Sequence, residues 1–274
     1  MKLGLGTVQF GQAYGVSNTR GQVSREDAAA ILGRAAAAGM TVLDTAANYG
    51  AAESVLATLD TAPFRIVTKT ISVRNGVDAV VARARQSAET LNADTLLVHA
   101  AADLNDVALW PALQQLKAEG IFRRIGISAY VSDDPLVLAQ TFKPDAMQLP
   151  FSVLDQRLLK SGVLDRLKRS GVEIHARSIF LQGLLFLDTL PEKLRHAALE
   201  LSITKAAIAA SGATPLQAAI TFALSRPEID VALVGVTSVG ELDEIVTAAT
   251  KPLPELDWSS LALTDETVLT PSLW

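Results

Sequence analysis

Eight short apolar runs recur along the 274-residue chain. Their apolar residues stand on consecutive positions, which is typical of parallel strands buried on both faces. The runs cover residues 3–7, 42–43, 66–68, 96–98, 125–127, 146–149, 174–176 and 231–234. Their ends are mostly 20 to 37 residues apart, the length that one strand and one crossover helix require. Eight such units predict an α/β fold, a (β/α)8 TIM barrel, for which about 250 residues are typical.

Helix signals occupy the intervals between the runs. Residues 24–27, Ser-Arg-Glu-Asp, form a capping box that predicts a helix start, and Gly39 predicts the end of this Ala-rich helix. The interval that follows the seventh run is longer than the others. It predicts an extra helix, because both 192–210 and 214–224 have helical character.

The rest of the chain adds no second unit. Residues 252–274 contain three prolines and predict an irregular C-terminal tail over one mouth of the barrel. No linker, repeat of solenoid type or low-complexity tract interrupts the sequence. We therefore expect a single (β/α)8 barrel domain over residues 1–274.

Composition excludes several function classes. The net charge of −5 argues against nucleic acid or an anionic membrane as the main partner. The chain has no cysteine, so disulfides and thiolate chemistry are excluded. It also lacks a signal-like apolar start and any run of about 18 apolar residues, which predicts a cytoplasmic protein.

Four reactive side chains stand where apolar runs end. Asp44 follows the second run, Lys69 the third and His99 the fourth, while Tyr49 lies five residues beyond Asp44. The carboxyl ends of the strands of a barrel form one rim, where active sites lie. A phenol has a pKa of about 10 and needs help to transfer protons near neutrality, and an adjacent ammonium provides it. A carboxylate would hold that ammonium, and a neutral imidazole would orient a substrate oxygen. The four residues predict a proton-transfer site.

Each of these residues also has a structural interpretation when taken alone. Asp44 could be a capping or turn residue at the end of a strand, Lys69 could be a solvated lysine, and Tyr49 could serve packing. His99 could equally be a structural histidine whose ring is hydrogen-bonded. Their convergence on one predicted rim favours function. By contrast, His175 in a strand and His196 in a helix are expected to be structural, and the three histidines lack metal-ligand spacing, so we expect no metal.

The order Asp44-Thr45-Ala46-x-x-Tyr49-Gly50, then Lys69, then His99, resembles the catalytic tetrad of the aldo-keto reductase family. The resemblance extends from Gly6 to about Ile245. It implies an oxidoreductase that interconverts a carbonyl (aldehyde or ketone) and an alcohol, and that uses NADP or NAD without a Rossmann domain. It also implies that Tyr49 is the general acid–base residue, which Lys69 and Asp44 tune, and that His99 orients the carbonyl.

The same resemblance implies a cofactor site. Ser128 and Gln148 would hold the nicotinamide carboxamide, and Ser178 would face the pyrophosphate. The full set of implied cofactor-binding residues is Thr7, Asp44, Ser128, Gln148, Arg177, Ser178, Phe180, Gln182, Gly235, Thr237, Ser238, Glu241 and Glu244.

Four positions depart from the family pattern. Ala129 replaces an asparagine, and Ile245 replaces the asparagine that faces the adenine. Arg177 stands where an aromatic residue usually stacks on the nicotinamide; a guanidinium can stack on a ring, but its charge disfavours the oxidised cofactor. Glu241 stands where arginine or glutamine is common, and a carboxylate repels a 2′-phosphate. We therefore expect a weakened preference for NADP, with use of both cofactors or of NAD.

Two other functions are compatible with parts of the sequence. Lys69 could be the Schiff-base nucleophile of a barrel aldolase, although Asp44 beside it would keep the amine protonated. The chain could also be a non-catalytic, nicotinamide-binding redox-sensing subunit. For the substrate, a small carbonyl compound or alcohol, we expect contacts from residues 9–14, from residues 100–110, and from Trp258 and Trp274 in the tail. A monomer is the expected state.

Overall fold

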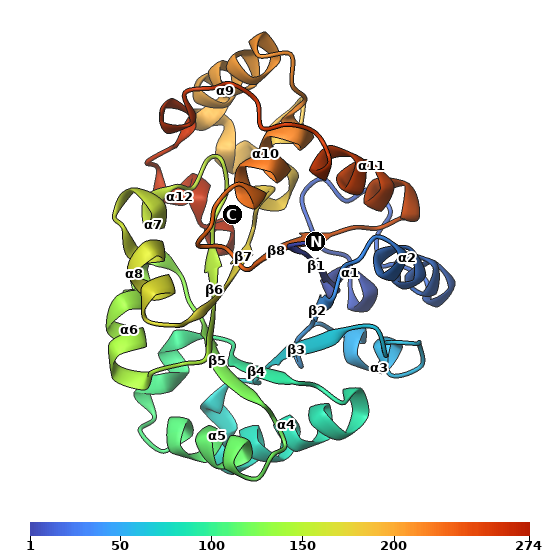
Figure 1. Cartoon of the computed structure of the whole chain (residues 1–274), viewed down its shortest axis with the longest axis vertical. Coiled ribbons are helices and arrows are strands. Elements are labelled where there is room, and N and C mark those ends of the chain that lie inside the picture. Colours follow the sequence, from blue (N-terminus) through green and yellow to red (C-terminus); the bar gives the residue numbers. More distant parts are fainter.

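Eight parallel strands close into a barrel in sequence order, β1 to β8 (Figure 1). The structure is a computed structural model that describes residues 1–274, apart from the side chain of Ser272. The strands are β1 (Leu3–Gly6), β2 (Val42–Asp44), β3 (Arg65–Lys69), β4 (Thr95–Val98), β5 (Arg124–Ser128), β6 (Ala146–Pro150), β7 (Glu173–Arg177) and β8 (Val231–Gly235). Each coincides with one of the predicted apolar runs, so the predicted (β/α)8 fold is confirmed.

Helices surround the barrel and connect its strands (Figure 1). The α-helices are α1 (Val8–Gly11), α2 (Arg25–Ala37), α3 (Ala52–Leu56), α4 (Val77–Leu91), α5 (Leu109–Ala118), α6 (Pro135–Phe142), α7 (Arg157–Lys160), α8 (Val163–Arg169), α9 (Ala198–Ala210), α10 (Pro215–Leu224), α11 (Val239–Ala249) and α12 (Glu266–Leu269). The 3₁₀ segments are η1 (Val73–Asn75), η2 (Ala101–Asn105), η3 (Val131–Asp133), η4 (Leu181–Phe186), η5 (Glu192–Ala197), η6 (Trp258–Leu261) and η7 (Pro271–Leu273).

The predicted helix boundaries agree with the chemistry of the helix ends. The Ser24 hydroxyl accepts a hydrogen bond from the Asp27 amide at 3.0 Å and caps α2, and Gly39 follows with a φ of 77°. In the long interval after β7, the segment predicted as one helix is divided into η5 and α9. Thr214 caps the next helix, α10.

The C-terminal tail packs beside the segment that follows β6. The Gln156 amide donates to the Trp258 carbonyl at 2.6 Å, and the Leu263 amide donates to the Leu154 carbonyl at 2.9 Å. The Trp258 ring lies 5.0 Å from that of Phe222 in α10. The tail contains η6, α12 and η7, so it is more ordered than the sequence predicted.

Among the described residues, no single helix has both the length and the apolar character needed to cross a membrane. One pair, Glu192–Ala210 with Pro215–Leu224, reaches that length and composition together, but an 84° bend separates its parts.

Three layers of side chains fill the barrel from bottom to top. Residues two apart on a strand face the same side, so the inward-facing residues of one strand lie at successive heights. The middle layer is apolar and consists of Val42, Val67, Leu97, Ala146, Val231 and Leu233. Gly126 of β5 lies at this level and has no space for a side chain, because a Cβ atom would lie 2.2 Å from the Ala146 carbonyl oxygen and 2.6 Å from the Leu97 side chain. This layer separates the two mouths of the barrel.

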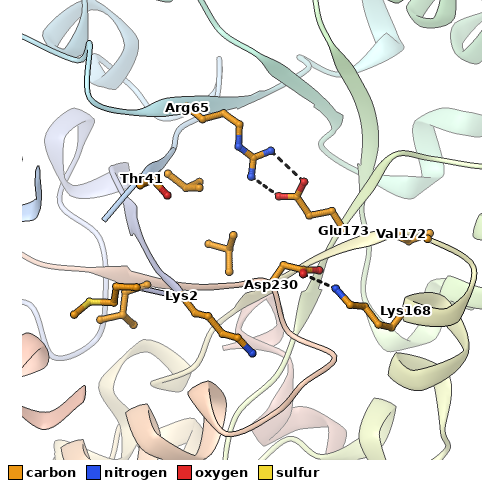
Figure 2. A pocket seen from close by; sticks show the side chains of 12 residues that line it. Lys2, Thr41, Arg65, Lys168, Val172, Glu173 and Asp230 are labelled. Carbon is orange, nitrogen blue, oxygen red and sulfur yellow. Dashed lines mark hydrogen bonds and ion pairs between the residues drawn. The ribbon is translucent and has the colours of Figure 1, made fainter. Parts of the chain in front are cut away.

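The bottom layer, at the amino ends of the strands, is a network of ion pairs (Figure 2). The Glu173 carboxylate accepts hydrogen bonds from the Arg65 guanidinium and from His175 Nε2, which lies 2.7 Å away. The Arg124 guanidinium lies 3.5 Å from the same carboxylate. Lys168 pairs with Asp230 at the same mouth. Burial would raise the pKa of Glu173, but the hydrogen bonds from His175 and Arg65 outweigh it and lower the pKa to about 2.

Glu173 should therefore stabilise the barrel in a pH-dependent way. Its folded-state pKa is lowered, so its contribution is present above the ordinary carboxyl pKa of 4.5 and is lost as the pH falls toward 2. Glu173→Gln should lower the free energy of unfolding at pH 7 by about 1–3 kcal/mol, because the Arg65 and Arg124 guanidinium groups lose their counter-charge. Urea unfolding at pH 7 and at lower pH measures the free energy of unfolding. The difference in this free energy between the variant and the parent protein should become smaller as the pH falls.

The matched control is Glu255→Gln, which removes an exposed carboxylate in the tail. This substitution should leave the free energy of unfolding unchanged at each pH. A Glu173→Gln variant as stable as the parent at pH 7 would show that the bottom ion pairs do not support the fold.

Candidate functional site

A cavity of about 800 Å³ opens at the carboxyl ends of the strands. Asp44, Tyr49 and His99 line it, while Lys69 lies beneath its floor with 1% of its surface exposed. Three of these residues stand two positions after a member of the middle apolar layer: Asp44 after Val42, Lys69 after Val67 and His99 after Leu97. The top layer is therefore polar because the strand alternation continues upward beyond the apolar layer.

Asp44 and Lys69 form a buried ion pair. The Lys69 ammonium lies 2.6 Å from one carboxylate oxygen of Asp44 and donates a second hydrogen bond, of 2.8 Å, to the Thr45 carbonyl. The other oxygen of Asp44 accepts a hydrogen bond of 2.6 Å from the Gln148 amide. Burial would lower the pKa of Lys69, but Asp44 and Tyr49 together outweigh it and raise the pKa. The ammonium is therefore charged at neutral pH.

Tyr49 reaches the site from the loop after β2. The Lys69 ammonium lies 4.8 Å from the centre of its ring, and the His99 ring meets it edge-on, with centroids 5.8 Å apart. A close backbone contact fixes this loop: a Cβ atom on Gly11 would lie 1.7 Å from the Tyr49 carbonyl oxygen. Only glycine at position 11 permits α1 to pack this closely against the turn that carries Tyr49.

His99 is held in its neutral form. Burial is the main cause that lowers its pKa to about 4; the charges of Lys69 and, to a smaller extent, Arg177 contribute, and Asp44 opposes them. The His99 amide donates to the Thr70 hydroxyl at 3.2 Å, which anchors the backbone at the end of β4. A neutral imidazole has one N–H donor that can bind a substrate oxygen.

Most of the predicted cofactor residues line the same cavity. They are Asp44, Ser128, Gln148, Arg177, Ser178, Phe180, Gln182, Gly235, Thr237, Glu241 and Glu244. Ser128 and Gln148 are paired in register on β5 and β6 and lie side by side. The loop after β7 is strained, since Ser178 and Gln182 have φ values of 60° and 54°.

Two predicted cofactor residues, Thr7 and Ser238, do not line the cavity. The Thr7 hydroxyl is buried and donates to the Asp44 carbonyl at 3.0 Å, so it supports the end of β2. Ser238 caps α11 by accepting a hydrogen bond of 3.2 Å from the Glu241 amide. Both residues stand behind the cavity wall and position residues that face it.

The chemistry of the cavity suits an elongated polar molecule such as a dinucleotide. The buried Oε1 of Gln9 accepts no hydrogen bond from the described residues, although Gln9 lines the cavity. A Cβ atom on Gly235 would lie 2.7 Å from the Gln9 amide nitrogen, so glycine at position 235 leaves the room that the Gln9 side chain occupies. Together with the donors and acceptors of Ser128 and Gln148, these groups fit a nicotinamide cofactor. No group of three or more metal-ligating side chains occurs in the part of the chain that the structure describes.

The substrate-facing predictions were partly wrong. Tyr14, from the predicted 9–14 segment, lines the cavity, but residues 100–110 and both tail tryptophans do not. Trp110 packs against Phe142 and Trp258 against Phe222, because each aromatic ring is used in packing around the barrel.

Other lining residues were not singled out from the sequence. They include Asn48, inside the motif that carries Tyr49, and Tyr130, two residues after Ser128. The position of Tyr130 directly beyond a strand end was a usable signal for it. Ser17 and Asn18 lie in a loop without a motif, so no local signal marked them.

Comparison with known proteins agrees with this geometry. Residues 2–265 match the model of the Aldo/keto reductase family. The chain belongs to this family. L-galactose dehydrogenase of Arabidopsis thaliana is 29% identical in an alignment 275 positions long, which covers 91% of this chain and 86% of that protein. The structure of a Bacillus halodurans aldo-keto reductase in its holo form superimposes with a TM-score of 0.77 at 18% identity, covering 100% of this chain and 93% of that one, and shows that the fold is shared.

Membership of the aldo/keto reductase family supports an NAD(P)(H)-dependent oxidoreductase. Within this aldo/keto reductase, the residues predicted to bind the two ends of the cofactor lie on different elements. Ser128, Gln148 and Arg177 belong to β5, β6 and β7. Thr237 lies in the β8–α11 connection, and Glu241 lies in the first turn of α11. The cavity therefore has a catalytic end and an α11 end.

Proposed function

We propose that the protein interconverts an aldehyde or ketone and an alcohol, with NAD(P)(H) as cofactor and Tyr49 as general acid–base residue. One observation carries the proposal: the Tyr49 ring stands in the cavity between a buried ammonium at 4.8 Å and a neutral imidazole at 5.8 Å. This arrangement can move a proton to or from a substrate oxygen at neutral pH. Membership of the aldo/keto reductase family supports the same class of reaction.

Each side chain has a distinct part in the proposed reaction. The Tyr49 hydroxyl donates its proton to the carbonyl oxygen during reduction and takes it back from the alcohol during oxidation. The Lys69 ammonium stabilises the phenolate that remains, and Asp44 keeps this ammonium charged and in place. The neutral His99 donates a hydrogen bond to the substrate oxygen. A bound nicotinamide cofactor supplies or accepts the hydride.

Ser128 and Gln148 are proposed to hold the carboxamide, with Ser178 and Gln182 along the pyrophosphate. The Glu241 carboxylate accepts hydrogen bonds from the Thr237 amide at 2.6 Å and from its hydroxyl at 2.8 Å. The Thr237 amide near the start of α11 could otherwise bind a phosphate, but it already donates to the Glu241 carboxylate. Residues 235–245 contain no lysine or arginine. We therefore propose a preference for NAD(H) over NADP(H).

The substrate is proposed to be a small carbonyl compound or alcohol with further hydroxyl groups. The catalytic end of the cavity presents the polar side chains of Tyr14, Asn48 and Tyr130 beside Tyr49. Such groups bind hydroxyls rather than a long apolar chain. The similarity to L-galactose dehydrogenase supports a sugar-like compound.

A Schiff-base aldolase is disfavoured by the state of Lys69. A nucleophilic amine must be neutral and must reach the substrate. Lys69 is instead 1% exposed, ion-paired with Asp44 and has a raised pKa. A redox-sensing subunit would bind the cofactor without turnover, so an activity assay separates it from the proposed enzyme.

Tyr49→Phe should reduce kcat by about 10²–10⁴-fold, because it removes the acid–base hydroxyl while preserving the ring. The measurement is steady-state turnover on a panel of aldoses and simple aldehydes, with NADH and with NADPH. Retained binding of NADH, followed by fluorescence, shows that the variant keeps its cavity. Turnover equal to that of the parent protein would remove Tyr49 from the proposed role.

The dissociation constant for NADH should be at least about tenfold lower than that for NADPH. Glu241→Gln should narrow this difference, because glutamine can still accept the hydrogen bonds from Thr237 but has no charge. Asp243→Asn is the matched control: Asp243 is an acidic residue on the same helix, but it pairs with Arg34. A hundredfold preference for NADPH in the parent protein is incompatible with the proposal.

A further inference from the structure

Arg177 is a cation of the cavity without an anionic partner. It ends β7 and lines the cavity with its side chain half-buried. Its guanidinium lies over the Tyr130 ring, 4.2 Å from the centroid, and donates a hydrogen bond of 3.3 Å to the Ala129 carbonyl. It makes no ion pair with any carboxylate whose side chain the structure describes. Neutral groups alone hold this charge in place.

The catalytic end of the cavity therefore has a net positive charge. Asp44 is neutralised by Lys69 at 2.6 Å, and His99 is uncharged near pH 7. The other lining carboxylates, Glu241 and Glu244, belong to α11 at the other end. Among the residues that line the catalytic end, no carboxylate compensates Arg177; Asp103, in η2, acts on His99 from outside the lining.

The charge of Arg177 acts on other groups of the cavity. Burial is the main cause of the lowered pKa of His99, and Arg177 contributes to the lowering. Burial likewise raises the pKa of Tyr14, and Arg177 opposes that rise. Arg177 thus affects titratable groups on the loops after β1 and β4, so its field extends across the catalytic end.

Strand geometry places Arg177 beside the residues proposed to hold the nicotinamide. β7 pairs with β6, and the partner of Gln148 in the register is His175, two residues before Arg177 on the same face. Gln148 in turn pairs with Ser128. These three residues come from three neighbouring strands and face one end of one cavity. A ring held by Ser128 and Gln148 would therefore lie near the guanidinium.

We propose that Arg177 makes the protein bind the reduced nicotinamide cofactor more tightly than the oxidised one. This inference rests on the proposed function. The nicotinamide ring is cationic when oxidised and neutral after it gains a hydride, so a fixed positive charge disfavours only the oxidised form. A planar guanidinium can still stack on the neutral ring. Arg177 is thus a specificity-determining residue for the redox state of the cofactor.

The test is the ratio of dissociation constants of NAD⁺ and NADH, measured by fluorescence and calorimetry, with NADP⁺ and NADPH in parallel. The parent protein should bind the reduced form at least about tenfold more tightly. Arg177→Met should reduce this ratio about tenfold, mainly through tighter binding of the oxidised form. Arg177→Lys keeps the charge and should keep the ratio within about threefold of the parent value.

Arg74→Met is the matched control, because it removes an exposed arginine from the loop after β3, outside the cavity. Its ratio should equal that of the parent. An unchanged ratio in a folded Arg177→Met variant overturns the inference while the proposed function stands; this includes the case in which Arg177 binds an anionic substrate and only KM changes. If the parent protein binds none of the four cofactor forms, the proposed function and this inference both fail.

Discussion

The buried ion pair between Lys69 and Asp44 is the interaction on which the rest of the site depends. Removing two charged groups from water costs several kcal/mol per ion. Their mutual attraction offsets this cost only when further hydrogen bonds satisfy the remaining donors and acceptors. Here the Thr45 carbonyl and the Gln148 amide provide those hydrogen bonds, at 2.8 and 2.6 Å. The pair therefore fixes a charged ammonium below the Tyr49 ring, and this ammonium adds to the burial that keeps the His99 imidazole neutral. The proposed proton donor Tyr49 and the proposed hydrogen-bond donor His99 thus both lie near one buried cation.

The layered interior explains why these groups meet at all. The strands place a residue in the interior at every second position, so a charged bottom layer, an apolar middle layer and a reactive top layer follow from the alternation along each strand. In β7 the buried His175 takes the place of an apolar middle residue, Glu173 below it forms ion pairs at the bottom mouth, and Arg177 above it faces the cavity. The same strand thus contributes to stability at one end and to the candidate site at the other.

Much of this could be predicted from the sequence, because both the strands and the reactive residues leave local signals. Asp44, Lys69 and His99 directly follow apolar runs, and their convergence requires only a parallel barrel. Other contacts join segments that are far apart in the chain and leave no such signal. Examples are the contact of Gly11 with the turn that carries Tyr49 and the packing of the Arg177 guanidinium over the Tyr130 ring. Trp258 was misplaced for the same reason. Its aromatic character suggested a binding surface, whereas its neighbour in the fold is Phe222.

The central claim is that Lys69 acts through Tyr49 rather than on the substrate directly. A double-mutant cycle with Lys69→Met and Tyr49→Phe, read out as kcat/KM for carbonyl reduction, tests it most directly. If the claim holds, Lys69→Met lowers kcat/KM in the parent protein but changes it less than about threefold once the Tyr49 hydroxyl is gone. Losses that multiply in the double variant would contradict the account, since they would show that the two residues act independently.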